Sequence, residues 1–597
     1  MVALIYKKVA GMVLVLAVLA AVSTASESED RRRLVCDASK YEINGQCNNL
    51  GNPTWGMPNT VYVRHEPVAF SDGLKAKRDG PNERTISQVL AKDTPHFGNP
   101  HLLTLLLPFF GQFLAHDVAS TRSIAEVGDT DEHLTYVEIE DPNDPFYTLS
   151  QDDPPAMQVG LSALHTDGFG VGHPINEITH FVDLSSVYGS HAELLSQLRS
   201  HEGGRLILTD YRVDGRPFGL STILLRNQLP NEAMIGVEGH SFLRKFVPPE
   251  ERLLAGDLRV IENPELGAYH LLWVLEHNRY AAELALQNPD WTDDQLFERA
   301  REWTVASYQN VVFYEFVRAV VGPVLFAGVE TYGGYNPMVD PRMDVSFVTS
   351  AFRFGHTMIP DDIPILDIES DTVIGSLPVV GLFHGKFGPL TANLITRGQA
   401  NLLYSLYVFG AREPDEKASD TMRNFPDPFD VLAANLVRER LHGLPAYNSL
   451  RKARHPAGAA ADIYQQQGCA PEYESSPGDD PLGCFMSITH DMEKAELLRQ
   501  LYGKVKYVDG FMGMMMEHTP TGSALGKTQG AIFVDQFMRS RDGDRWWFEN
   551  TANGLFTAEE VTTIKSRRLA DIISDNFDVP REKLGEYVFV NPKSATV

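Results

Sequence analysis

Segment 109–117 places two polar side chains that could take part in proton transfer four residues apart in an apolar stretch. In a helix, Gln112 and His116 would share one face, whereas Asp117 would point about 100° away. The spacing therefore predicts that one face serves a pocket and the next holds a cation. A histidine that only satisfies its own hydrogen bonds within a helix is the alternative for His116 taken alone.

Oxygen-bearing side chains recur at alternate positions in segment 179–185. Thr179, Asp183 and Ser185 supply them, and Phe181 can offer its carbonyl. Hard oxygen ligands in a tight loop suit Ca²⁺. A half-buried strand with its polar side chains facing water explains the same alternation equally well.

Arg259 and Glu262 lie just before Pro264, a residue that favours the first turn of a helix. A fixed guanidinium can stabilise negative charge that develops on a leaving oxygen. An ordinary salt bridge within one turn is the simpler explanation of the pair.

Two further segments each combine a histidine with arginines. In segment 351–357, His356 ends an apolar helical stretch, and Gly355 beside it would let a flat group approach the backbone. Segment 435–448 begins with Asn435 and also contains Arg, Glu and His. A buried core histidine or a solvated Arg/Glu face accounts for either segment by itself.

Helices must position most of these residues. Apolar residues recur at helical spacing in segments 102–120, 264–286, 292–321, 345–356, 396–409, 429–440, 492–502 and 558–576. Strand signals are sparse, and segment 205–209 is one short candidate. Because no segment reads as a linker between autonomous domains, the sequence predicts a mainly α fold: one large helical unit with little β structure.

Composition limits the possible partners. The 597 residues include 43% apolar and 22% charged residues, which are ordinary globular values. The formal net charge is 52 − 79 = −27. An acidic chain repels phosphate, so we expect no nucleic-acid partner.

The first residues are typical of a secretory signal peptide. Lys7 and Lys8 precede an apolar run over residues 9–22, and a polar stretch follows Ala25. We therefore expect residues 1–25 to be a signal peptide and the protein to be secreted. A membrane anchor is the alternative, but the run is shorter than the ~20 residues that span a bilayer, and we expect no later membrane span.

The four cysteines predict disulfides, because an even count in a secreted chain favours them. Three pairings are possible. The local pairs Cys36–Cys47 and Cys469–Cys484 are the simplest.

Together and in this order, the five segments resemble the animal haem peroxidases, the family of myeloperoxidase, peroxidasin and peroxinectin. Supporting stretches lie at residues 47–50, 181–190, 276–279 and 541–545. The resemblance runs from about residue 36 to about residue 590. After the signal peptide (1–25), we therefore expect an N-terminal segment (26–50) with the Cys36–Cys47 loop, a haem peroxidase domain (51–590) and a short tail (591–597).

The resemblance implies roles on both sides of a haem. His116, Gln112 and Arg259 match the distal residues that act on peroxide. His356 matches the proximal ligand of the haem iron, and Asn435 matches the residue that accepts its ring N–H.

Three more residues are implied to hold the haem itself. Glu262 matches a carboxylate that forms an ester to the haem, and Arg353 and Arg438 match groups near the haem propionates. The calcium ligands are implied to be Asp117, Thr179, the Phe181 carbonyl, Asp183 and Ser185.

The implied function is a secreted peroxidase with haem b and Ca²⁺ that uses H₂O₂, through an oxyferryl state, to oxidise small donors. These donors are phenols and other aromatics, or bromide, iodide and thiocyanate. A monomer is the expectation. The alternatives are a related dioxygenase, which needs a tyrosine where this chain has Arg353, and a haem-poor extracellular adhesion or matrix protein on the same scaffold.

Departures from the family pattern modify these expectations. Ala115, directly before His116, cannot form a second haem ester, so we expect at most one, through Glu262. Asn263 stands where myeloperoxidase has a methionine linked to the haem, which makes chloride oxidation less favourable than that of the softer donors. Leu441 replaces a usual aspartate and puts a local ion pair in doubt.

Overall fold

The structure is a computed structural model. It describes residues 36–93, 99–124, 133–149, 154–213, 223–229, 253–379, 398–425, 428–455, 457–593 and 595–596. The predicted signal peptide, residues 1–25, lies outside the described residues.

Helices form most of the regular structure, which confirms the mainly α prediction. The α-helices are α2 (Glu83–Leu90), α3 (Leu106–Val118), α4 (Ser185–Tyr188), α5 (Ala192–Leu198), α7 (Pro264–Gln287), α8 (Asp293–Val311), α9 (Arg318–Ala327), α10 (Val345–Thr349), α13 (Gly398–Val408), α14 (Asp420–Arg423), α15 (Val431–Leu441), α16 (Tyr447–Arg454), α17 (Glu472–Ser475), α18 (Leu482–Phe485), α19 (Met492–Tyr502), α20 (Gly510–Met515), α21 (Lys527–Asp542), α22 (Ala558–Ser566) and α23 (Leu569–Asn576). Tighter 3₁₀ turns include η4 (Leu258–Ile261) and η6 (Ala351–Met358), and η5 (Val312–Val317) is a π-helical segment.

The strands form small sheets at the periphery. The pairs are β2 (Leu134–Glu138) with β3 (Ala156–Gly160), β6 (Thr209–Val213) with β7 (Ile223–Gln228), and β8 (Asp362–Asp367) with β9 (Thr372–Pro378), all antiparallel. Strands β1 (Thr60–Val61), β5 (Gly172–Asn176) and β4 (Leu164–Thr166) form a three-stranded sheet, and β10 (Phe409–Gly410) pairs with β11 (Ala595–Thr596) in parallel.

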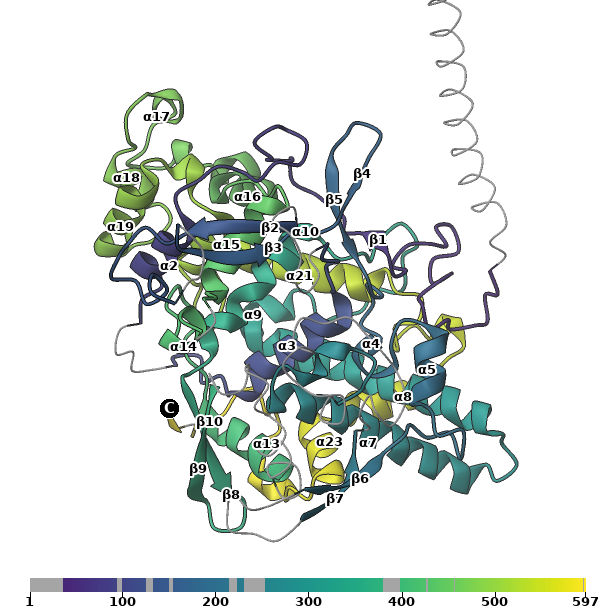
Figure 1. Cartoon of the computed structure of the whole chain (residues 1–597). Helices are drawn as coiled ribbons and strands as arrows, with labels where there is room; N and C mark the ends of the chain where they lie inside the picture. Colours follow the sequence, from purple (N-terminus) through teal and green to yellow (C-terminus); the bar gives the residue numbers. More distant parts are fainter. Residues whose placement is uncertain are drawn as a thin grey trace, which may run out of the picture.

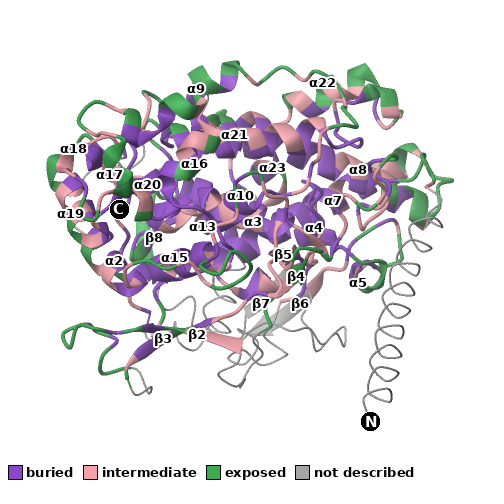
Figure 2. Cartoon of the chain, turned by 90° about the horizontal axis from the view of Figure 1, so that it is seen from above, coloured by how far each residue is buried: buried purple, intermediate pink, exposed green. Residues whose placement is uncertain are grey.

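Helix α3 lies near the centre of the molecule (Figures 1 and 2), among the buried elements. Its apolar residues are buried around almost the whole circumference, as expected for a core helix. The Phe110 ring lies 5.5 Å from the Tyr269 ring, 5.4 Å from Phe316 and 5.0 Å from Phe589, measured between centroids. This aromatic cluster joins α3 to α7 and η5 and holds the helix that carries His116.

The predicted helix 345–356 is broken in the structure. Asp344 caps α10 by accepting the Ser346 N–H at 2.7 Å, and α10 ends before Ser350, whose φ and ψ of −130° and −67° are not helical. A 3₁₀ segment, η6, then continues to Met358. A 3₁₀ turn has three residues, so side chains three apart lie on the same side, and this spacing later matters for Arg353 and His356.

Other long helical predictions are also divided. The segment predicted at 292–321 comprises α8, the π segment η5 and the start of α9, and regular geometry stops at Gly322, whose φ is 76° and which precedes Pro323. The segment predicted at 558–576 consists of α22 and α23, because Arg567 and Arg568 adopt extended backbone angles between them.

The strand predicted at 205–209 is wrong except at its last residue. Strand β6 begins at Thr209, and Leu206 forms only an isolated bridge with Arg199. The β8–β9 hairpin was not predicted from the sequence. Figure 1 shows it at the lower edge of the molecule.

Both local disulfides are present, Cys36–Cys47 and Cys469–Cys484. The first closes a loop that packs onto the helical unit, since Arg545 donates to the backbone oxygens of Ala38 and Cys47. The N-terminal loop is thereby held against the chain more than 490 residues away.

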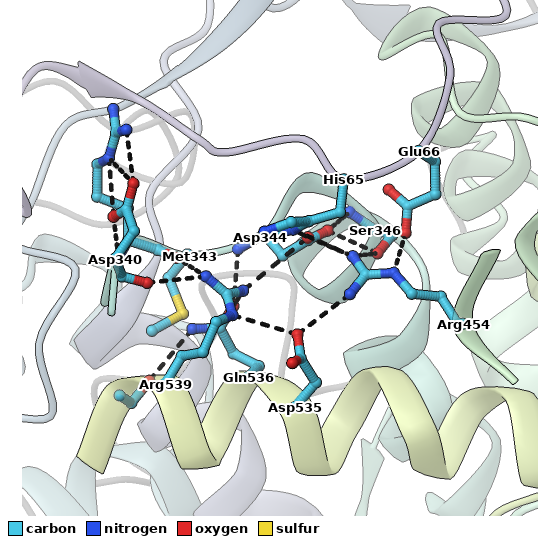
Figure 3. A network of polar contacts seen from close by, with 12 residues as sticks. His65, Glu66, Asp340, Met343, Asp344, Ser346, Arg454, Asp535, Gln536 and Arg539 are labelled. Carbon is cyan, nitrogen blue, oxygen red and sulfur yellow. Dashed lines mark hydrogen bonds and ion pairs between the residues drawn. The ribbon is translucent and has the colours of Figure 1, made fainter. Parts of the chain in front are cut away.

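A buried network of charges anchors the elements that lead to η6 (Figure 3). Asp344 contacts both His65 and Arg454, and Arg454 also contacts Glu66 and lies 3.1 Å from Asp535 of α21. The Asp344 N–H donates to Gln536 at 2.8 Å. Because Asp344 also caps α10, this network fixes where the segment before His356 begins.

One described helix, Asp293–Ala327, is long and apolar enough to cross a membrane by length and composition alone. By this criterion alone it departs from the sequence prediction that no later stretch is long and apolar enough to span a membrane. Of its most apolar window, 61% is buried inside the molecule, as in the core helix of a folded unit.

Candidate active site

A cavity of about 300 Å³ lies between α3, η4, the start of α7 and η6. The polar side chains at its surface are Gln112, His116, Arg259, Glu262, Asn263, Arg353 and His356. The remaining lining is largely apolar, including Leu107, Phe109, Val348, Phe352, Phe354, Ile359, Met422 and Val431. The cavity therefore brings together residues from three of the five segments singled out in the sequence, and a residue of a fourth, Asn435, contacts His356.

Helix α3 presents Gln112 and His116 on the cavity side, as their four-residue spacing predicts. His116 is 8% exposed, and its Nδ1 has no hydrogen-bond partner among the described residues. It is therefore not a helix histidine with satisfied hydrogen bonds. Burial, helped by the positive charge of Arg259, holds the pKa of His116 well below its usual range, so its imidazole is neutral and can accept a proton.

Arg259 is held by Asp257 rather than by Glu262. Its Nε donates to Asp257 at 2.9 Å, and its Nη2 donates to the same carboxylate at 2.5 Å. Nη2 also donates to the backbone oxygens of His116 and Ala119 at the end of α3. Burial acts to raise the pKa of Asp257, but the neighbouring Arg259 holds it well below the ordinary value, so the guanidinium has a fixed, ionised partner.

Glu262 lies beside both polar residues of α3 that line the cavity. Gln112 Nε2 donates to Glu262 Oε2 at 2.9 Å, and His116 Nε2 lies 3.6 Å from the same oxygen. Burial raises the pKa of Glu262 to about 7. This carboxyl is thus poised between its neutral and charged forms near neutral pH.

His356 projects from η6 into the cavity, and the tight 3₁₀ spacing places Arg353 on the same side. The amide of Asn435, on α15, lies 3.0 Å from His356 Nδ1. Burial, together with Arg353, lowers the pKa of His356 to about 3. A neutral imidazole with its Nδ1 occupied leaves Nε2 for a metal ion.

Arg353, beside this histidine, and Arg438, near Arg353, have no carboxylate partner among the described residues. Arg353 donates to the Val348 carbonyl at 2.9 Å, and Arg438 donates to Ser162 Oγ at 2.8 Å. Burial, with the nearby positive charge of Arg353, lowers the pKa of Arg438 to about 10.

Haem fits these residues. It needs apolar walls for its ring, an imidazole for its iron and cations for its two carboxylates. The cavity offers the apolar walls, His356 offers the imidazole, and Arg353 and Arg438 offer the cations. Gly355 leaves this wall open, because a Cβ built on it would lie 3.9 Å from the nearest atom.

The predicted calcium residues meet at the end of α3. Segment 179–185 is a buried bend there and not a half-buried strand. Thr179 Oγ1 donates to Asp183 at 3.0 Å, and Ser185 Oγ donates to the Asp117 backbone oxygen at 2.6 Å. Phe181 lies between them in the chain, also buried.

Two carboxylates meet here, Asp117 at the end of α3 and Asp183 in the bend, and neither has a described cation beside it. Burial raises the pKa of Asp117 to about 7, and burial together with Asp117 raises that of Asp183. One oxygen of Asp117 has no hydrogen-bond partner among the described residues. No described group of three or more His, Cys, Asp and Glu side chains could hold a metal, so a cation here would rely on two carboxylates and on neutral oxygens.

Three supporting residues were missed from the sequence. Asp257 fixes Arg259, and its position two residues earlier was a usable signal. Ser162 accepts a hydrogen bond from Arg438, and His442 Nε2 lies 2.9 Å from the same Ser162 Oγ. Ser162 lies 276 residues from Arg438, and no local pattern predicts such a contact.

Comparison with known proteins identifies the family of the chain. The family model of the animal haem peroxidases matches residues 41–589. The chain is 28% identical to the dual oxidase of Drosophila melanogaster over 94% of its own length, and 28% identical to the myeloperoxidase of Mus musculus over 94% of its length and 77% of that protein. It spans about a third of the dual oxidase, 34% of that protein's length.

The fold also matches a solved structure. Peroxidase A of Dictyostelium discoideum superposes with a TM-score of 0.74 and 24% identity, covering 92% of this chain and 99% of that one. The family match extends over nearly all of the described residues. The chain belongs to the animal haem peroxidase family.

Proposed function

We propose that this protein is a haem peroxidase that uses H₂O₂ to oxidise small donors. One observation carries the proposal: a single cavity contains two histidines with unlike surroundings. His356 has its Nδ1 beside Asn435, whereas His116 lies beside Arg259 with its Nδ1 unpartnered among the described residues. An iron site needs one axial ligand and one open position, and this difference supports both.

Haem, when bound, would supply the iron that cleaves peroxide and that then takes electrons from the donors. His356 would be the iron ligand, and Arg353 and Arg438 would hold the haem carboxylates. His116 would take a proton from one peroxide oxygen and return it to the other. Arg259, kept in place by Asp257, would stabilise negative charge on the leaving oxygen.

The proposed donors are phenols and other aromatics, or bromide, iodide and thiocyanate. Asn263 cannot form a thioether-derived link to haem, so the iron should be less electron-poor than with such a link. Chloride is harder to oxidise than bromide or iodide, so it is the least favoured donor. We also propose secretion, because of the predicted signal peptide at residues 1–25, a monomeric state, and a peroxidase domain over residues 51–590.

An absorption spectrum before and after one equivalent of H₂O₂ tests the function. We expect a Soret band in the purified protein that changes within milliseconds to seconds. A Soret band that peroxide does not alter would mean that His116 and Arg259 do not act on peroxide. No Soret band after haem supplementation would instead favour the haem-poor adhesion protein.

Replacing Glu262 with glutamine is expected to abolish any covalent link between protein and haem. An ester needs a carboxyl group at the cavity, and Ala115 provides no second one. Extraction into acidified organic solvent, followed by mass measurement of the pigment, should show at most one ester in the wild type and none in Glu262→Gln.

Glu265 offers a matched control for that variant. It is fully buried one turn further along, its pKa is also raised to about 7 by burial, and it does not line the cavity. Glu265→Gln should therefore leave the linkage unchanged. Two ester links in the wild type, or pigment retained by Glu262→Gln, would contradict the assignment.

We further propose that Asp117, Thr179, the Phe181 carbonyl, Asp183 and Ser185 bind Ca²⁺. Two buried carboxylates without a described cation are costly, and a bound cation would relieve this cost. Asp117 follows His116 directly, so the ion would also hold the end of α3.

Calcium removal is expected to lower stability and to disturb the distal side of the cavity. A ligand present at a thousandfold excess over its Kd stabilises a fold by about 4 kcal/mol. Unfolding temperature should fall after dialysis against a chelator and return with Ca²⁺ but not with Mg²⁺, which dehydrates less readily. Asp183→Asn should already show the lower value, and an unfolding temperature that no chelator changes would contradict the site.

A further inference from the structure

Asn263 joins the start of α7 to Gln112 of α3. It is 3% exposed, lies in the wall of the cavity, and uses both ends of its amide. We infer that Asn263 is a positioning residue: it sets which end of the Gln112 amide faces Glu262 and the cavity, and so favours the binding of small anions there. This inference rests on the proposed peroxidase function and names a determinant of its donor choice.

The direction of the Asn263 amide follows from the helix cap. Its Oδ1 accepts the backbone N–H of Leu266 at 2.8 Å. A backbone N–H can only donate, so this end must be the oxygen. The nitrogen must therefore face the other way, and Nδ2 donates to Gln112 Oε1 at 2.9 Å.

The same reasoning then fixes Gln112. Its oxygen is taken by Asn263, so its nitrogen is the atom that faces Glu262 Oε2, at 2.9 Å. An amide nitrogen carries two N–H groups. Among the described residues the second one has no acceptor, and Gln112 lines the cavity.

The consequence is electrostatic. With this orientation Gln112 offers N–H groups to Glu262 and to a guest in the cavity, on the same side as the guanidinium of Arg259. If the amide were reversed, Gln112 Oε1 would face Glu262 Oε2, oxygen against oxygen, and would repel an anion in the cavity. A hydrogen bond to a charged group contributes more than one between neutral groups, so the orientation should alter anion affinity measurably.

The anchor is rigid because it is part of a helix terminus. Asn263 occupies the position before Pro264, which begins α7, and its cap bond holds the first turn. Asn263 and Gln112 are 151 positions apart in the chain, so this link belongs to tertiary packing.

Two substitutions separate orientation from capping, because serine and aspartate are both good helix caps. Asn263→Ser keeps a cap oxygen but has no amide nitrogen for Gln112. Asn263→Asp keeps size and cap but presents an acceptor to Gln112 Oε1. Asn82→Ser is the matched control, since Asn82 caps α2 in the same manner by accepting the Thr85 N–H at 3.0 Å, away from the cavity.

The first measurement is azide binding to the ferric, haem-loaded protein at pH 7, followed by the Soret band. We expect the Kd for azide to rise about tenfold in Asn263→Ser, more in Asn263→Asp, and not at all in Asn82→Ser. The KM for bromide should rise in parallel in the Asn263 variants, whereas the KM of a neutral phenol should change much less.

A double-mutant cycle with Gln112→Leu gives the decisive comparison. If Asn263 acts by orienting Gln112, Asn263→Ser should add no further loss of azide affinity in the Gln112→Leu protein. An equal loss of azide affinity in both backgrounds, or no loss in either, would overturn the inference. In that case a wild-type Soret band that responds to peroxide would still support the proposed function. A wild type without haem overturns both.

Discussion

His116→Leu is expected to slow the reaction of the haem-loaded protein with H₂O₂ by about 10²–10⁴-fold, the usual contribution of a positioned acid or base. Leucine is apolar and similar in size, so it fills the same part of α3 but cannot carry a proton between the peroxide oxygens. Burial and Arg259 hold the pKa of His116 low, so the imidazole of the wild type is neutral and has a ring nitrogen free to take that proton. Stopped-flow recording of the Soret band measures the rate directly.

Two controls accompany this variant. The resting spectrum should match that of the wild type, because His116 does not bind the iron in the proposed arrangement. His173→Ala removes a histidine of β5 that pairs with Asp167 outside the cavity, and it should react with peroxide at the wild-type rate. A His116→Leu protein that reacts at the wild-type rate would refute the role of His116.

His356→Gly is expected to remove the iron ligand and to reduce peroxidase activity by more than about 100-fold. Loss of an outer partner of a metal ligand already costs about 10–100-fold, and loss of the ligand itself should cost more. The Soret band should shift or disappear, and added imidazole should restore part of both the spectrum and the activity by occupying the vacated position.

Asn435→Leu provides the graded comparison for that result. Its amide lies 3.0 Å from His356 Nδ1, so its removal should cost about 10–100-fold without abolishing haem binding. Failure of imidazole to restore any spectrum in His356→Gly, with a folded protein by circular dichroism, would show that the loss does not arise from the iron ligand. Unchanged activity in His356→Gly would overturn the assignment outright.

Local spacing within the sequence was enough for several parts of the site. The four-residue interval between Gln112 and His116 placed both on the cavity side of α3, and Pro264 marked the start of α7, because helical period and proline geometry depend on only a few neighbouring residues. The two disulfides were also local, 11 and 15 residues apart in the chain.

Local spacing was insufficient where two conformations compete. The apolar pattern of 345–356 suits an α-helix, yet Ser350 breaks it and a 3₁₀ turn follows. Packing against surrounding elements decides between these forms, since their intrinsic free energies are close. The 3₁₀ turn aligns Arg353 and His356, which are three residues apart, more closely than an α-helix would.

The order of the motifs in the sequence is enough to indicate the family. Short-range periodicity is enough to predict the helical class and the faces on which single residues lie. The contacts between residues that are distant in the chain are seen only in the folded structure. It placed Arg259 against the end of α3, 140 residues earlier in the chain, and it joined Asn263 to Gln112. The physical reason is that such contacts depend on how buried helices pack in three dimensions, which no local period encodes.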